Sequence, residues 1–192
     1  SERGGDWNWG NVQSAGGCCL VVGDKLYFYV SGRTDTPGSF DDRAHKCTTG
    51  LATLRRDGFV SMGAGDKVGR LTTRPVRFKG KHVFVNVDAD EGELRAELLD
   101  KDGDVIAPFT RENCAPISAD KTLQAVNWKG AKDLSALAGE VVRFRFYLTN
   151  GELYAFWVSP DASGASHGYV AAGGPGFTGP TDTVGSLATE SR

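Results

Sequence analysis

The sequence lacks any long apolar run, and no stretch approaches the roughly 20 apolar residues that a membrane-spanning helix needs. It also lacks an initiating methionine, since it opens with Ser1-Glu2-Arg3-Gly4. That opening does not have the charged and then apolar character of a secretory signal. We therefore expect no membrane span, and a chain that is a processed product or an excised piece of a longer protein.

Neither sign of charge dominates. The 22 Lys and Arg residues nearly balance 24 Asp and Glu, which gives a net charge of -2 and a pI near 5.9. Such a chain has no general attraction for phosphate backbones, so we expect no nucleic-acid partner. Hydrophobic residues at 40% and aromatic residues at 10% predict a folded chain, because disordered chains are poor in both.

Metal-ligand patterns are missing as well. The four cysteines, Cys18, Cys19, Cys47 and Cys114, form no C-x-x-C pair of the kind found in zinc sites, and the three histidines show no ligand spacing,. We expect no metal and no cofactor. Two states of the cysteines remain open: buried free thiols, or one or two disulfides in an exported protein, with Cys47 and Cys114 as the first pair to test.

Two short motifs imitate catalytic or metal sites. Residues 164–168 read Gly-Ala-Ser-His-Gly, which matches G-x-S-x-G, but no helix pattern follows and no histidine lies later in the chain,. Residues 100–104 resemble the start of a calcium loop, yet the twelfth position is Arg111 in place of the required glutamate,. We interpret the first as a loop and the second as a hairpin turn.

Glycine is abundant, with 26 residues, and most glycines lie between short apolar runs. The runs predict strands, and Asp57-Gly58 and Asn150-Gly151 predict hairpin turns. In residues 93–99 and 141–149, apolar and polar residues alternate as in strands with one buried face. The pattern predicts an all-β fold, an antiparallel two-sheet β-sandwich of jelly-roll or concanavalin-like type, with an N-terminal β-hairpin.

Composition suggests four segments. We predict an N-terminal hairpin segment at residues 1–33, a polar linker loop at 34–49, the β-sandwich domain at 50–172, and a flexible tail at 173–192, where apolar residues are scarce,.

Aromatic residues offer the best candidates for binding. An aromatic ring with a polar edge suits both the C–H groups and the hydroxyls of a sugar. Such platforms could come from Trp7, Trp9, Trp128, Trp157, Tyr27, Tyr29, Tyr147 and Tyr154. Trp157 and Tyr154 fit a core strand better, whereas Trp7 and Trp9 lie in a polar stretch and are either exposed or packed between domains. The candidate glycan-binding residues are Trp7, Trp9, Asn11, Gln13 and Arg33.

Three stretches, Asn11–Gly17, Leu26–Arg33 and Thr49–Phe59, resemble the end of a five-bladed β-propeller that passes into a C-terminal β-sandwich. Overall, the chain resembles the C-terminal part of the family 32-like and family 43-like glycoside hydrolases of bacterial exported proteins. The resemblance implies that residues 1–33 are a remnant of the last blade and that the protein is secreted or periplasmic. The family's catalytic residues do not map onto this chain, since Arg56-Asp57-Gly58 lacks the proline of the stabiliser motif.

Two functions follow as expectations. The first is a non-catalytic accessory β-sandwich of a carbohydrate-active protein, which packs on and stabilises a catalytic propeller domain. The second is an autonomous glycan-binding module that uses exposed aromatic residues. A complete small hydrolase is a weaker third possibility, because no acid, base or nucleophile set stands out. We expect the chain by itself not to be catalytic, although the parent protein would be a glycoside hydrolase.

Overall fold

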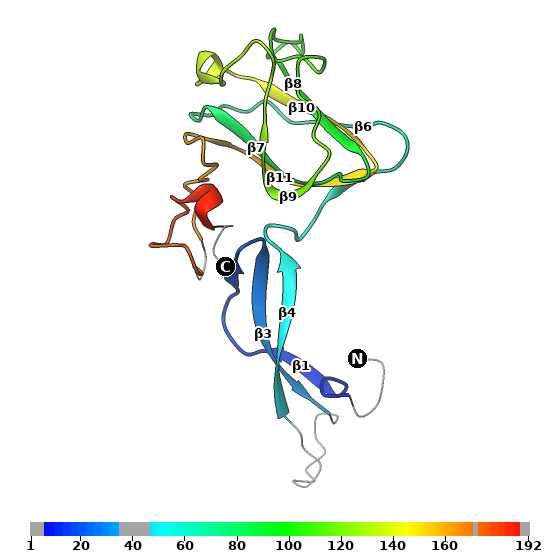
Figure 1. The fold of residues 1–192 in the computed structure, drawn as a ribbon, viewed down its shortest axis with the longest axis vertical. Helices are drawn as coiled ribbons and strands as arrows, with labels where there is room; N and C mark the ends of the chain where they lie inside the picture. Colours follow the sequence, from blue (N-terminus) through cyan, green and yellow to red (C-terminus); the bar gives the residue numbers. More distant parts are fainter. Residues whose placement is uncertain (1–5, 35–46, 171–172, 189–192) are drawn as a thin grey trace.

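The fold is all-β and antiparallel, as the sequence predicts (Figure 1). A computed structural model describes residues 6–34, 47–170 and 173–188. Two facing sheets form a β-sandwich, and a further sheet at the N-terminus projects from one end of it (Figure 1). No helix among the described residues has the length and apolar character needed to cross a membrane.

The sandwich is built from seven strands and one short helical turn. One sheet has the order β6-β10-β8 and the other has the order β5-β11-β7-β9. The elements are β5 (Met62–Ala64), β6 (Gly69–Thr72), β7 (His82–Asp88), β8 (Glu93–Leu99), β9 (Asp120–Val126), the 3₁₀ turn η1 (Ser135–Leu137), β10 (Arg143–Thr149) and β11 (Gly151–Ser159).

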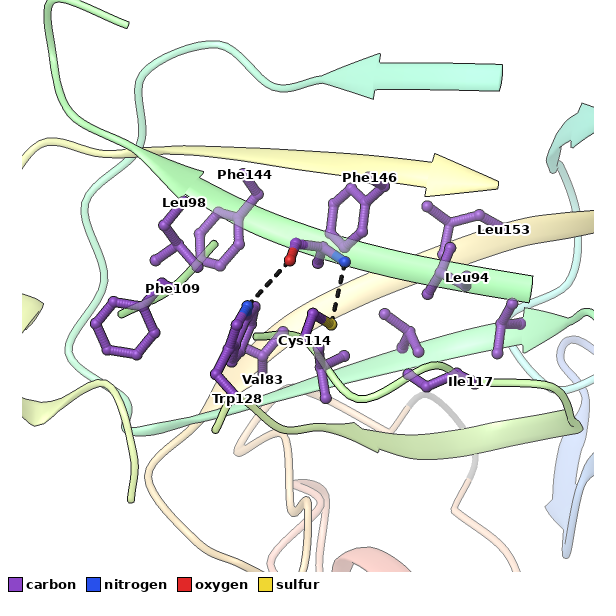
Figure 2. Close-up of a cluster of buried hydrophobic side chains, with 14 of the residues drawn as sticks. Val83, Leu94, Leu98, Phe109, Cys114, Ile117, Trp128, Phe144, Phe146 and Leu153 are labelled. Atoms are coloured by element: carbon purple, nitrogen blue, oxygen red, sulfur yellow. Dashed lines mark hydrogen bonds between the residues drawn. The ribbon is translucent and has the colours of Figure 1, made fainter. Parts of the chain in front are cut away.

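The core lies between these two sheets. Phe144 and Phe146 of β10 point inward, as do Leu94 and Leu98 of β8, and all four are buried. The predicted alternation is therefore confirmed along β10, whereas in β8 Glu97, expected on the solvent side, is also buried. Figure 2 shows how a polar contact is made within this core: the Trp128 indole Nε1 donates to the carbonyl of Ala96 at 3.0 Å. Trp128 is thus a core residue and is not an exposed aromatic platform.

The Asn150-Gly151 turn does not make the hairpin that the sequence predicts. It joins β10 to β11, and these strands belong to different sheets. Phe146 of β10 and Phe156 of β11 meet across the core, with ring centroids 5.1 Å apart. The turn carries the chain from one sheet to the other because both strands direct apolar side chains into the same interior.

The N-terminal sheet comprises β1 (Asn11–Ser14), β2 (Leu20–Val22), β3 (Lys25–Arg33) and β4 (Cys47–Arg55). The predicted hairpin of β2 and β3 is present and turns at Gly23, whose φ is +56°. On its other edge β3 pairs with β4 along the whole length of both strands, from Lys25 opposite Arg55 to Arg33 opposite Cys47.

This pairing changes the predicted segments. Residues 47–49 of the expected linker belong to β4, and the expected start of the sandwich at residue 50 falls inside that strand. The rest of the linker, residues 35–46, lies outside the described residues. The Asp57-Gly58 hairpin is absent, because β4 pairs with β3 while β5 pairs with β11. β4 forms nine residue pairs with β3, and the three-residue β5 pairs with β11 in the other part of the molecule.

Residues 173–188, here termed the C-terminal segment, also differ from the prediction of a flexible tail. The Val21 amide donates to the carbonyl of Gly173 at 2.9 Å, and Asp182 and Ala188 are buried. The segment ends in the 3₁₀ turn η2 (Gly185–Ala188). Hydrogen bonds and close backbone contacts hold this segment, so its low apolar content was a poor guide. Residues 189–192 lie outside the described residues.

Candidate functional site

The N-terminal sheet has two faces of different chemistry. Because side chains alternate along a strand, the register assigns each residue of β1, β3 and β4 to one face,. The tyrosine face carries Asn11, Gln13, Lys25, Tyr27, Tyr29, Ser31, Arg33, Cys47, Thr49, Leu51, Thr53 and Arg55. The tryptophan face carries Val12, Ser14, Leu26, Phe28, Val30, Gly32, Thr48, Gly50, Ala52 and Leu54, and Trp7 lies on it.

The tyrosine face brings together three of the five predicted site residues. Asn11 lies opposite Arg33, and Gln13 lies opposite Ser31. Tyr29 is two residues from Ser31 on the same strand face and is 48% exposed. An aromatic ring therefore stands among amide, guanidinium and hydroxyl groups on an open sheet surface. The glycan-binding role of these residues stays a prediction.

Trp7 lies on the opposite face, apart from those three residues. A Cβ atom added at Gly32 or at Gly50 would lie only 2.3 Å from atoms of the Trp7 ring. The indole therefore rests directly on the backbone of β3 and β4, in a space that only glycine leaves open. Trp7 remains 39% exposed, and Trp9 is 42% exposed. The structure thus divides the predicted set between two faces.

The tryptophan face is covered at one end and open elsewhere. Next to the sandwich, Val21 and Leu26 are buried in a small apolar cluster with Val170. Further along, the Phe59 ring meets Phe28 edge-on at 6.4 Å, yet Phe59 is 68% exposed and Val60 is 75% exposed. This apolar surface was not predicted from the sequence. The sequence pattern that could have revealed the surface is the alternation of residues 26–32, but these residues could be assigned to a face only once the pairing with β4 was known.

Arg55 joins the N-terminal sheet to the sandwich. Its Nε donates to the Asn86 side chain at 2.7 Å and its Nη2 donates to the carbonyl of Val87 at 2.9 Å. It also forms an ion pair with Asp120, and the guanidinium lies 4.7 Å from the centroid of the Tyr154 ring. Four groups of the sandwich thus converge on one side chain of β4.

The neighbouring Arg56 joins the same sheet to the C-terminal segment. Its guanidinium lies 5.4 Å from the centroid of the Phe177 ring, and its Nη2 is 3.4 Å from a carboxylate oxygen of Asp182. Burial raises the pKa of Asp182, but hydrogen bonds from the amides of Gly185, Ser166 and Val184, together with the charge of Arg56, hold that pKa below its ordinary value,. The carboxylate is therefore structural and ionised.

The apparent catalytic motif is part of this same structure. The Ser166 hydroxyl donates to Asp182 at 3.3 Å, while His167 Nε2 contacts Asp161 at 2.5 Å. The serine and the histidine thus have separate partners and do not form a nucleophile–base pair. The interpretation of residues 164–168 as a loop agrees with these contacts.

The calcium-like loop is a turn, as predicted. One carboxylate oxygen of Asp100 accepts hydrogen bonds from the amides of Asp102, Gly103 and Asp104, each at 2.9 Å. These bonds, led by that from Asp104, lower the pKa of Asp100. Within residues 6–34, 47–170 and 173–188, no three His, Cys, Asp or Glu side chains lie close enough to hold a metal ion.

Of the two states left open for the cysteines, the structure has free thiols: none of the four is in a disulfide, and Cys47 and Cys114 are not paired. Cys114 is buried in the sandwich core, where its sulfur accepts a hydrogen bond from the Ala96 amide at 3.2 Å (Figure 2). Cys47 is exposed at the start of β4. Burial raises the pKa of the Cys114 thiol, so this group is a packed apolar side chain and is poorly reactive,.

No protein family, curated protein or solved structure matches this chain. The resemblance to glycoside hydrolases of families 32 and 43 therefore remains an expectation from the sequence.

Proposed function

We propose that the chain is a non-catalytic glycan-binding module of an exported carbohydrate-active protein, and that the tyrosine face is its binding surface. The observation that supports this most directly is the exposed Tyr29 ring on the same face of the sheet as Asn11, Gln13 and Arg33, with Gln13 diagonal to it across β1 and β3. The sandwich then serves as the scaffold that holds the sheet through Arg55.

The chemistry of the tyrosine face suits a neutral polysaccharide. A tyrosine ring can pack on the C–H face of a sugar, and its hydroxyl can bond to water or to the ligand. Asn11 and Gln13 each offer an amide donor and an acceptor, and Arg33 offers further donors. The nine-residue strands β3 and β4 are about 30 Å long,, and this length suits several sugar units of an extended chain better than a single sugar.

Replacing Tyr29 by alanine is expected to weaken binding to a recognised polysaccharide about tenfold, because a stacked ring contributes about 1 to 1.5 kcal/mol. Affinity gel electrophoresis against fructan, arabinan, xylan and β-glucan would measure the effect. Y169A is the matched control, since Tyr169 is 77% exposed and lies outside the N-terminal sheet. Equal retardation of Y29A and the unchanged protein would contradict the proposal, as would no retardation by any of these polymers.

A second candidate function is the accessory role, in which the tryptophan face packs on a propeller domain of the parent protein. The exposed Phe59 and Val60 favour it, because adjacent large apolar side chains on a surface often mark an interface,.

The accessory role predicts that F59S/V60S, in the intact parent protein, lowers the melting temperature of the propeller and leaves glycan binding at the tyrosine face unchanged. Differential scanning calorimetry of the parent protein would show this. The matched control is V105S, which removes an exposed apolar side chain on the sandwich. An unchanged propeller transition in F59S/V60S would exclude the accessory role at this face.

A further inference from the structure

A pocket of about 260 Å³ lies at the end of the sandwich where β7 begins and β9 ends. Its polar lining consists of Lys81, His82, Asn127, Lys132 and Asp133, and its apolar lining includes Phe109, Val126, Trp128 and Leu134. This volume is below the 300 to 1,000 Å³ typical of drug-sized ligands. The pocket would therefore take one ring or a short chain.

The pocket is formed by fixed groups. The Trp128 indole, held by its bond to the Ala96 carbonyl, meets the Phe109 ring edge-on at 5.7 Å. The Leu134 amide donates to the carbonyl of Lys81 at 2.8 Å and so ties the loop after β9 to the chain that enters β7. These contacts hold the walls of the pocket in place.

The charge around the pocket is mainly positive. Lys81 and Lys132 are both exposed, and neither forms an ion pair with any described residue. The one carboxylate, Asp133, accepts a hydrogen bond from the Ser135 amide at 2.9 Å. Bonds from the Ser135 hydroxyl and amide, with the nearby His82 and Lys81, lower the pKa of Asp133. Asp133 thus accepts its hydrogen bonds from Ser135 at the start of η1, and neither ammonium group lies within ion-pair distance of a carboxylate among the described residues.

We propose that this pocket binds a small organic anion, a carboxylate attached to a ring, with the ring against the apolar lining and the carboxylate between Lys81 and Lys132. Charge-assisted hydrogen bonds are about twice as strong as neutral ones, and two ammonium groups can share one carboxylate. A uronic acid unit at a glycan end and a free aromatic acid share this chemistry. The pocket is separate from the tyrosine face, and the proposal does not depend on glycan binding there.

The test is titration of the full chain with glucuronate, benzoate, glucose and benzamide, followed by ¹H–¹⁵N chemical shifts. Both anions, or one of them, should shift the amides of Ala131 and Leu134, and the neutral analogues should not. A response to glucuronate alone identifies a uronic acid site, and a response to benzoate alone identifies an aromatic-acid site. K81Q/K132Q is expected to weaken binding by about tenfold per lysine, because each loses one charge-assisted bond.

The matched control is K67Q/K101Q, which removes the same charge from exposed positions outside the pocket. Its affinity should equal that of the unchanged protein. The proposal is overturned if neither anion shifts these amides at millimolar concentration, if benzamide or glucose binds as well as its acid, or if the control weakens binding as much as K81Q/K132Q.

Discussion

Replacing Asp182 by asparagine is expected to lower the free energy of unfolding by about 3 kcal/mol, because a buried charged acceptor is lost from several partners at once. The residue is 2% exposed. It accepts from the amides of Ser166, Val184 and Gly185 and pairs with Arg56. An asparagine would turn an NH₂ group toward donors that already occupy this site. Thermal or urea unfolding at pH 7 measures the loss.

The same carboxylate should make the free energy of unfolding depend on pH, which can be measured independently. Its pKa is lower in the folded chain than its ordinary value of 3.8. The folded state therefore gains stability that is complete above about pH 4 to 5 and is lost as the pH falls through the lower, folded-state pKa. Protonated Asp182 resembles asparagine, so the difference between the unchanged protein and D182N should narrow as the pH falls below 4.

D102N serves as the control. Asp102 is exposed and pairs only with the exposed Lys101, and such surface pairs contribute little. A loss in D182N no larger than that in D102N, or a difference that stays constant from pH 7 to pH 2, would show that the C-terminal segment does not depend on this carboxylate.

For β10 the sequence carried enough information to predict the strand and the residues that face the core. In β10 the alternation of Phe144 and Phe146 with Arg143 and Arg145 matches the buried and accessible sides of the strand. This prediction succeeds because burial of one face of a strand gives a local sequence pattern that repeats every two residues. Strand pairing is not local. Asn150-Gly151 has the composition of a hairpin turn, yet the strands on either side of it belong to different sheets that share one core. The sheet to which each strand belongs is set by its pairing partner, β8 for β10 and β7 for β11.

The structure divides the predicted binding set between two faces for the same reason. Asn11, Gln13 and Arg33 meet because β1 pairs with β3, and their equal parity along those strands could be seen in the sequence. Trp7 precedes the first strand, so no periodicity fixes its face. Its position follows from Gly32 and Gly50, which lie on two strands that are joined through residues 34–46. A contact between such distant positions leaves no local pattern.

The C-terminal segment shows a different limit. Its composition is poor in apolar residues, and composition predicts order through apolar burial. Here the order comes from hydrogen bonds at Asp182 and from glycines in close contact with backbone, such as Gly174, where an added Cβ would lie 1.8 Å from the carbonyl oxygen of Val21. Such contacts depend on where another part of the chain lies, so composition alone does not reveal them.

Replacing Arg55 by methionine should cost about 3 kcal/mol and should also separate the unfolding of the N-terminal sheet from that of the sandwich. Methionine keeps much of the apolar stem but leaves the Asn86 side chain, which is buried, and the Val87 carbonyl without their donors. Each buried acceptor left unpaired costs about 1 to 3 kcal/mol.

The sheet should respond more than the sandwich, because Arg55 is the side chain of β4 on which Asn86, Val87 and Asp120 of the sandwich converge. Hydrogen exchange should therefore become faster in β3 and β4 than in β8 and β10, and calorimetry should show a first transition at a lower temperature than the main one.

R70M is the matched control, since Arg70 lies exposed on β6 and forms no ion pair or side-chain hydrogen bond with any residue that the structure describes. If R55M unfolds in one transition with equal acceleration of exchange in all strands, Arg55 supports the whole fold and does not couple two units. In that case the scaffold role assigned to the sandwich in glycan binding would need another anchor, and the contact between Arg56 and the C-terminal segment would be the next to test by R56M.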